Sequence, residues 1–283
     1  MSSITDVVKE GLKYPFNDGK KVLTLGIILV VSSLVSIFME YMVFDNMRTL
    51  ANAAPIDTVQ AAISALPPSS VALVVLSWIV SLIFALFCAG YLYNVIKYSI
   101  EKRSDLPGFS DIKGIFVNGI KTVIVEIAYM ILPFILFLLG LMLTVNEAVS
   151  SSVNTIGGIL VVIAMIFLIF AALVEIMAIC NMVAKDDLKA AFDFKGILAQ
   201  IKSIGWGRFI GIIIFSGVVI AIISVFFEMI FGAIATGLSI LIGSALVMVL
   251  TKTILDSLLV NPYISIVLSR VYGSIYREAN SIE

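Results

Sequence analysis

The chain has 283 residues, of which 61% are hydrophobic and only 13% are charged. Soluble domains average about 45–50% apolar and about 25% charged residues, so the composition is that of a membrane protein. A net charge of -1 argues against binding to nucleic acid, which relies on clustered basic residues to meet phosphate. Both cysteines lie in apolar segments and histidine is absent, so we expect neither a disulfide framework nor a Cys/His metal site.

The sequence predicts an all-α fold, a polytopic membrane helix bundle of six transmembrane helices that forms a single integral membrane domain over residues 1–283. Each apolar segment reaches the length of about 20 residues that a helix needs to cross a ~30 Å hydrocarbon core. The predicted spans are 22–44, 71–99, 122–144, 156–184, 208–231 and 238–270. The last two divide an almost continuous apolar stretch at the small residues of 232–237, where a turn is expected.

Three short segments place apolar residues on one helical face and charged residues on the other. These segments, 3–14, 110–121 and 192–204, are predicted to be amphipathic interfacial helices on the cytoplasmic side. Gly205-Trp206-Gly207 is predicted to turn the chain from the membrane surface into the bilayer. The residues expected among the lipid head groups are Lys113, Lys195, Lys202, Trp206 and Arg208.

The basic residues are distributed unevenly between the two sides of the predicted bundle. Of the 18 Lys and Arg residues, the far-side segments 45–70 and 146–155 hold only Arg48, and Lys252 lies inside a span. Because Lys and Arg in short loops resist translocation, both termini are expected in the cytoplasm of a multi-pass protein of the cell membrane. The segment 45–70 has room for one short helix.

A five-residue pattern occurs twice before predicted spans. Residues 111–115 (DIKGI) and 193–197 (DFKGI) match at four of five positions. We interpret this as a trace of three parallel helical-hairpin repeats, each preceded by a surface helix and all pointing the same way, unlike the inverted repeats of many transporters. The alternative is convergence, since any amphipathic surface helix uses similar residues at this spacing.

Ionisable side chains at membrane depth are the candidates for a functional site, because an unpaired charge there costs several kcal/mol. Lys252 and Asp256 are four residues apart and share a helix face, and Glu175 lies inside the fourth span. The candidate buried polar site is Glu175, Lys252, Asp256 and Asn261. It is either a gated ion, proton or solute site or a structural ion pair that fixes helix packing.

Small polar residues continue along the sixth span in steps of four, next to Pro262. They are Thr253, Ser257, Asn261, Ser265 and Ser269. The row predicts either a wet crevice or hydrogen bonds between helices. Asn261-Pro262-Tyr263 marks either a hinge or a simple proline kink in a helix longer than the bilayer is thick.

Three segments together resemble one family. These are Val8–Phe16, Leu106–Phe109 and Ala191–Phe209. They look like an archaeal group of multispan membrane proteins that is known only as a domain of unknown function. The resemblance implies a six-span membrane domain and no activity. A fainter similarity, in architecture only, is to the membrane domain of some bacterial glycerophosphodiester phosphodiesterases.

We do not expect an enzyme or a cofactor, because no nucleophile elbow, His-Glu-x-x-His helix or phosphate-binding glycine loop is present. The favoured hypothesis is a non-catalytic protein that binds, organises or moves lipid or another hydrophobic molecule. The first alternative is a small-solute or ion transporter that uses the buried charges. The second is a scaffold subunit, a homo-oligomer or the partner of another membrane protein, with the small-residue row Ser77, Ser81, Ala85 and Ala89 as its seam.

Overall fold

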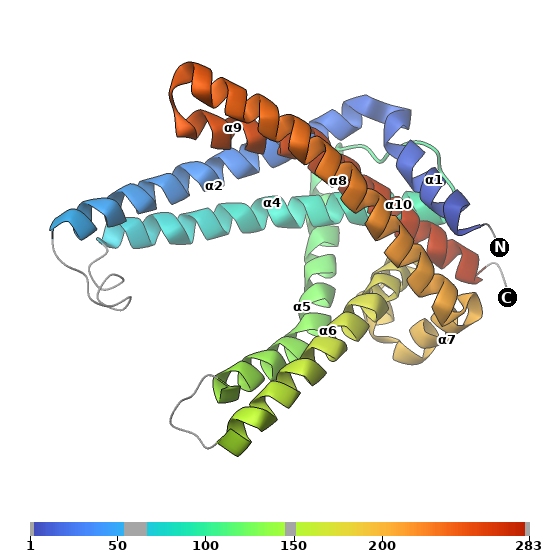
Figure 1. Cartoon of the computed structure of the whole chain (residues 1–283). Coiled ribbons are helices and arrows are strands. Elements are labelled where there is room, and N and C mark those ends of the chain that lie inside the picture. Colours follow the sequence, from blue (N-terminus) through green and yellow to red (C-terminus); the bar gives the residue numbers. More distant parts are fainter. Residues whose placement is uncertain (1–2, 54–66, 145–150, 281–283) are drawn as a thin grey trace. The chain divides into compact units, whose positions relative to one another are not determined.

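The computed structural model describes residues 3–53, 67–144 and 151–280, and every regular element in this part of the chain is helical (Figure 1). Six helical segments are long and apolar enough to cross a membrane. They are Ile4–Met39, Pro68–Ile100, Ile112–Thr144, Ser152–Lys185, Trp206–Ile242 and Ala245–Asn280. The predicted all-α, polytopic, six-helix architecture is confirmed. Residues 54–66 and 145–150 of the predicted far-side segments lie outside the described residues.

The predicted single domain consists of two compact units, each assembled from separate stretches of chain. The first unit comprises Met1–Asn17, Ala89–Val218 and Ile266–Glu283, and the second comprises Asp18–Cys88 and Val219–Ser265. Three long helices, α4 (Pro68–Ile100), α8 (Trp206–Ile242) and α10 (Asn261–Asn280), contribute one part to each unit.

Shorter and longer helices complete the two units. The first unit adds α1 (Ile4–Lys13), most of the 3-10 turn η1 (Tyr14–Asp18), α5 (Ile112–Thr144), α6 (Ser151–Lys185), the 3-10 turn η2 (Leu188–Phe192) and α7 (Phe194–Ile204). The second adds α2 (Gly19–Ala53), α9 (Ala245–Leu255) and the π-helix η3 (Asp256–Val260).

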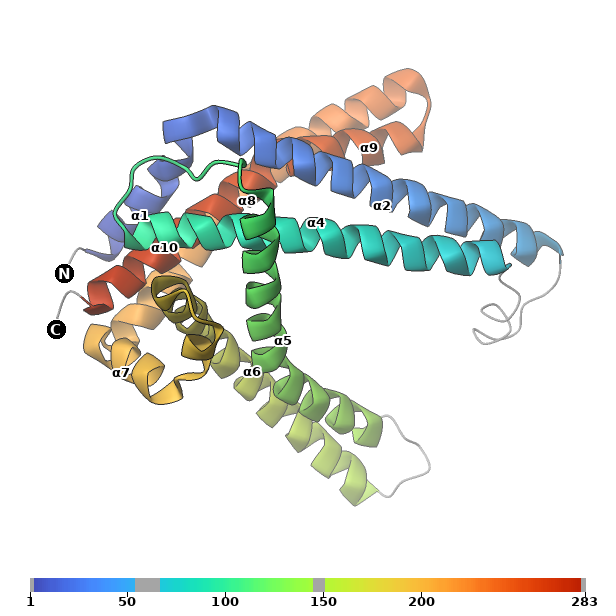
Figure 2. The ribbon, with the colours of Figure 1, turned by 180° about the vertical axis from the view of Figure 1, so that it is seen from behind.

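Helices α5 and α6 form the hairpin that supports the site in the first unit. The later part of α5 runs beside the earlier part of α6, and α5 changes direction partway along (Figure 2). Pro133 lies inside α5 and removes one backbone hydrogen bond, which accounts for a bend. The hairpin is close-packed, because a Cβ on Gly140 would lie 2.8 Å from the Val161 backbone nitrogen.

Two predicted boundaries are wrong. The turn expected at 232–237 lies at Gly243-Ser244, since α8 continues to Ile242 and Gly243 has a left-handed φ of +73°. Small residues such as Gly232 and Gly237 remain helical inside a long apolar stretch, where an unpaired backbone group is costly. Segment 110–121 is not a separate surface helix, because α5 runs without a break from Ile112 to Thr144.

The other two amphipathic helices are present, and each turns its apolar face to the protein. Val7 and Val8 of α1 are buried, as are Ile197 and Ile201 of α7. The exposed lysines on the opposite faces remain available to the surroundings. As predicted, α7 ends at a glycine hinge, where Gly205 has a φ of +90° and the chain enters α8.

The recurrent five-residue pattern has a local explanation. The Asp111 carboxylate accepts the Gly114 N–H at 2.9 Å, and the Asp193 carboxylate accepts the Gly196 N–H at 3.0 Å. A Cβ at either glycine would collide with the capping carboxylate. Helix capping therefore accounts for the shared Asp, and the glycine leaves room for the capping carboxylate. The three-copy repeat stays a prediction.

The tightest backbone approach in the first unit lies between α4 and α5. A Cβ on Gly90 would collide with the carbonyl oxygen of Ile115, whereas one on Gly217 would meet nothing within 4 Å. We therefore predict that Gly90→Ala destabilises the protein by about 1–3 kcal/mol, because two helix backbones must separate. Gly217→Ala is the matched control, with unchanged or slightly raised stability. Thermal unfolding in detergent measures both, and equal transition temperatures would contradict this packing.

Candidate functional site

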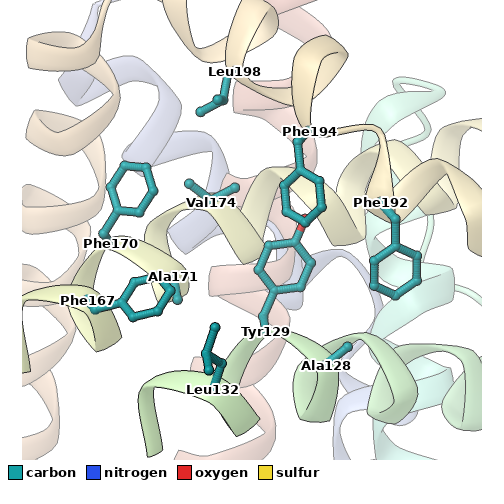
Figure 3. Close-up of a pocket in the computed structure, with 10 residues that line it drawn as sticks. All are labelled: Ala128, Tyr129, Leu132, Phe167, Phe170, Ala171, Val174, Phe192, Phe194 and Leu198. Atoms are coloured by element: carbon teal, nitrogen blue, oxygen red, sulfur yellow. The ribbon is translucent and has the colours of Figure 1, made fainter. Parts of the chain in front are cut away.

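A cavity of about 240 Å³, here called the aromatic cavity, lies in the first unit between the α5–α6 hairpin and the segment of η2 and α7. Figure 3 shows the Tyr129 ring pointing toward Phe194, with Phe170 and Phe167 on the other side of Val174. The lining residues are Ala128, Tyr129, Leu132, Phe167, Phe170, Ala171, Val174, Phe192, Phe194 and Leu198. The Tyr129 hydroxyl is the only polar group that these side chains carry.

Hydrogen bonds to two neighbouring carbonyl groups fix the wall made by η2 and α7. The Tyr129 hydroxyl donates to the Ala191 carbonyl at 2.7 Å, and the Asn181 amide donates to the Ala190 carbonyl at 2.8 Å. Both donors are buried, so loss of either partner would leave a costly unsatisfied group. The Tyr276 hydroxyl in turn donates to Asn181 Oδ1 at 2.9 Å.

Aromatic contacts give the cavity its shape. The Tyr129 ring centroid lies 5.7 Å from that of Phe194 and 6.3 Å from that of Phe192. Across the cavity, Phe170 stacks on Trp206 with centroids 6.0 Å apart. Phe194 and Phe170 remain 53% and 44% exposed, so the aromatic rim is open to the surroundings of the protein. In a membrane these surroundings include lipid chains.

The predicted head-group residues fall into two classes. Lys113, Lys195 and Lys202 are exposed and form no ion pair within the described chain. Trp206 is half-buried between Phe170 and Phe209. Arg208 is half-buried as well and donates to Glu278 at 2.6 Å, so its charge is neutralised within the protein. Of these five residues, only the three lysines present ammonium groups without an ion pair in the described part of the chain.

Two of these lysines flank the aromatic cavity on α7. Lys195, Leu198 and Lys202 are spaced three and four residues apart, so they share one side of the helix. Leu198 lines the cavity. Both ammonium groups therefore lie on the side of α7 that carries the cavity wall.

The expected pair of Lys252 and Asp256 is present in the second unit and has a third member. Lys252 Nζ lies 3.3 Å from Asp256 Oδ2 and 2.7 Å from Glu228 Oε1. The predicted site did not include Glu228. Because α8 continues to Ile242, Glu228 lies well inside the helix and needs the lysine as a counter-ion.

Asn261 is the fourth predicted site residue, and its backbone forms part of a π-helical turn. Its N–H donates to the Asp256 carbonyl, which closes the π-helical turn of η3 directly before Pro262. Inside this turn, the Ser257 hydroxyl lies 3.0 Å from that of Ser33 on α2, and a Cβ on Gly26 would collide with the Leu258 carbonyl. Ser257, one member of the polar row of the sixth span, thus helps to hold η3 against α2 in the second unit.

Glu175 belongs to the first unit, whereas Lys252, Asp256 and Asn261 belong to the second. Glu175 lines a separate cavity of the first unit together with Glu126 of α5. The predicted site did not include Glu126. The signal was available, since each carboxylate lies several turns inside a long apolar helix.

A buried ion cluster between the ends of the chain also escaped the sequence analysis. Arg270 is 5% exposed, donates to the Glu10 carboxylate at 2.7 Å and to the Arg103 carbonyl at 2.7 Å, and lies over the Tyr14 ring. Arg277 shares Glu10 at 3.3 Å. Glu10 is 260 residues from Arg270 and 267 residues from Arg277 in sequence, so no local pattern could reveal the pairing.

The family model for a protein of unknown function, DUF4013, matches residues 73–232. The chain belongs to this family. The match covers more than half of the chain and includes both walls of the aromatic cavity. It confirms the resemblance to an uncharacterised family. No curated protein and no solved structure matches the chain.

The Lys252 cluster makes a prediction about stability. Lys252→Met leaves Glu228 and Asp256 without a counter-ion, so we expect a loss of on the order of 1–3 kcal/mol. Glu228→Gln should cost less, because Lys252 keeps Asp256, and Glu228→Gln added to Lys252→Met should restore part of the loss. Thermal unfolding of the single and double variants in detergent measures the coupling. Strictly additive effects would contradict the cluster.

Proposed function

We propose that this is a non-catalytic integral membrane protein that binds lipid, with part of an acyl chain in the aromatic cavity. The observation that carries the proposal is the cavity itself, which has apolar walls from α5, α6 and α7 and an exposed aromatic rim. A cavity with apolar and aromatic walls fits an apolar ligand. Within a membrane, the partner in greatest supply is a lipid chain.

The apolar character of the cavity alone does not explain why a lipid chain would bind there and not remain in the bilayer. A lipid acyl chain that moves from the bilayer into the cavity exchanges one apolar environment for another. The hydrophobic effect therefore contributes little free energy to its binding. It gains dispersion contacts, because an unfilled cavity leaves its lining atoms without neighbours. The rigid aromatic walls held by Tyr129 and Asn181 favour an ordered chain in a fixed place.

The head group is proposed to be anionic. Lys195 and Lys202 are exposed on the cavity side of α7, and a lysine near an anionic membrane surface contributes about 1 kcal/mol. Two lysines therefore favour an anionic over a zwitterionic lipid by roughly 30-fold. The proposal assigns this face to the cytoplasmic leaflet of the cell membrane, on the uneven distribution of basic residues.

The described contacts favour this function over the two alternatives. Lys252 and Asp256, which a transporter would use, form a closed cluster with Glu228. Ser81, from the row that a scaffold would use as a seam, lies 3.2 Å from the Ser36 hydroxyl within the second unit. A structural role within the chain accounts for the Lys252 cluster and for Ser81.

Filling the aromatic cavity tests the proposal. Ala128 lines the cavity from α5 and is exposed, so Ala128→Trp adds a ring to the cavity without removing a core side chain. We expect the purified variant to retain less phospholipid, measured by native mass spectrometry after equilibration with phosphatidylglycerol or phosphatidylcholine. The unaltered protein should prefer phosphatidylglycerol, and phosphatidylglycerol should raise its unfolding temperature more than that of the variant.

Ala221→Trp is the matched control, since Ala221 is exposed on α8 in the second unit and lines neither described cavity. This variant should retain lipid as the unaltered protein does. Equal lipid retention by the Ala128→Trp variant, with its unfolding temperature preserved, would exclude the cavity as the lipid site.

A further inference from the structure

A second cavity of the first unit, here called the glutamate cavity, has a different chemistry. It has a volume of about 350 Å³ and lies between the unit's parts of α4, α5, α6 and α10. Leu92, Ile96 and Ile176 give it apolar walls. Glu126 and Glu175 bring two carboxylates to the same space from neighbouring helices.

Neither carboxylate has a counter-ion in the part of the chain that the structure describes. The ion pairs of this part involve other acidic residues, and neither glutamate accepts a hydrogen bond there. Glu175 lies ten residues before Lys185, the last residue of α6, which is about 15 Å along a helix. Two uncompensated carboxylates at this depth cost several kcal/mol each unless a positive group joins them or they take up a proton.

Ser269 is an independent sign of a missing partner. Its side chain lines the glutamate cavity from α10 and is only 5% exposed, yet it forms no hydrogen bond within the described chain. The Ser269 hydroxyl therefore keeps its hydrogen-bonding capacity for a group in the cavity. Thr122, on the same lining, donates its hydroxyl to the Asn118 carbonyl at 3.0 Å and so keeps its oxygen as an acceptor.

The lining suits an organic ammonium ion. Two carboxylates and two hydroxyl oxygens accept hydrogen bonds from N–H groups, and the aliphatic walls and the Tyr272 ring take the carbon skeleton. The volume falls in the range of about 300–1,000 Å³ that is usual for small-molecule sites. No group of three or more His, Cys, Asp or Glu side chains that could hold a metal ion occurs in the described part of the chain.

We propose that the glutamate cavity binds a small alkylammonium ion, with Glu126 and Glu175 as its counter-charges and Ser269 as an acceptor for one N–H. The two carboxylates favour a ligand with two ammonium groups over one with a single charge. This site is separate from the aromatic cavity and does not depend on the proposed lipid function.

Calorimetric titration of the purified protein with 1,4-diaminobutane, in detergent at neutral pH, tests the proposal. We expect saturable binding, weaker binding of n-butylamine and none of butane-1,4-diol, which has the same skeleton without charge. Glu175→Gln and Glu126→Gln should each weaken binding of the diamine by at least about 10-fold, and Ser269→Ala by a smaller factor.

Glu228→Gln is the matched control, because it removes a carboxylate of the second unit, and it should bind the diamine as the unaltered protein does. The Ala128→Trp variant should also bind the diamine normally, so failure of the lipid proposal is distinguishable from failure of this one. Absence of diamine binding, equal binding of the diol, or unchanged affinity in both glutamate variants with preserved unfolding temperatures would overturn the proposal.

Discussion

The aromatic cavity depends on two hydrogen bonds that hold a bend of the backbone against the α5–α6 hairpin. Tyr129 and Asn181 donate to the neighbouring carbonyls of Ala191 and Ala190. These carbonyls belong to a short 3-10 turn, which cannot satisfy all of its own backbone groups. The two side chains therefore set where α7 begins, and with it the positions of Phe192, Phe194 and the lysines of α7.

Composition and hydropathy were sufficient to predict the membrane class, the all-α fold and the approximate position of all six spans. Short sequence patterns also predicted features that depend only on residues within one turn of a helix. The hinge at Gly205 needs a left-handed backbone, and the Lys252–Asp256 pair needs only a four-residue spacing. The turn after α8 was misplaced, because small residues are compatible with both a helix and a turn inside an apolar stretch.

Contacts between segments that are distant along the chain could not be predicted from the sequence. The Glu10–Arg270 ion pair joins the first helix to the last, and Glu228 reaches Lys252 from another helix. Neither cavity has a local signature, since the aromatic cavity collects side chains from residues 128–198 and the glutamate cavity from residues 89–272. Apolar residues in a membrane span look alike in sequence whether they face lipid, protein or a cavity.

The charged residues of this family member fall into physically distinct groups. Buried charges such as Arg270 are paired and fix the helices, and exposed lysines on α7 are free to meet lipid. The paired carboxylates of the glutamate cavity stand apart, because they face a space instead of a counter-ion. This difference separates the structural charges from those for which we propose ligands.

The most direct measurement of the central claim is photochemical labelling by a phosphatidylglycerol that carries a diazirine in its acyl chain. After reconstitution into membranes and irradiation, peptide mass spectrometry locates the modified residues. The account predicts labelling concentrated at the cavity lining, on Ala128–Leu132 and Phe192–Leu198, and reduced by an excess of unlabelled phosphatidylglycerol. Labelling spread evenly over the exposed apolar residues of all six spans, with no competition, would contradict it.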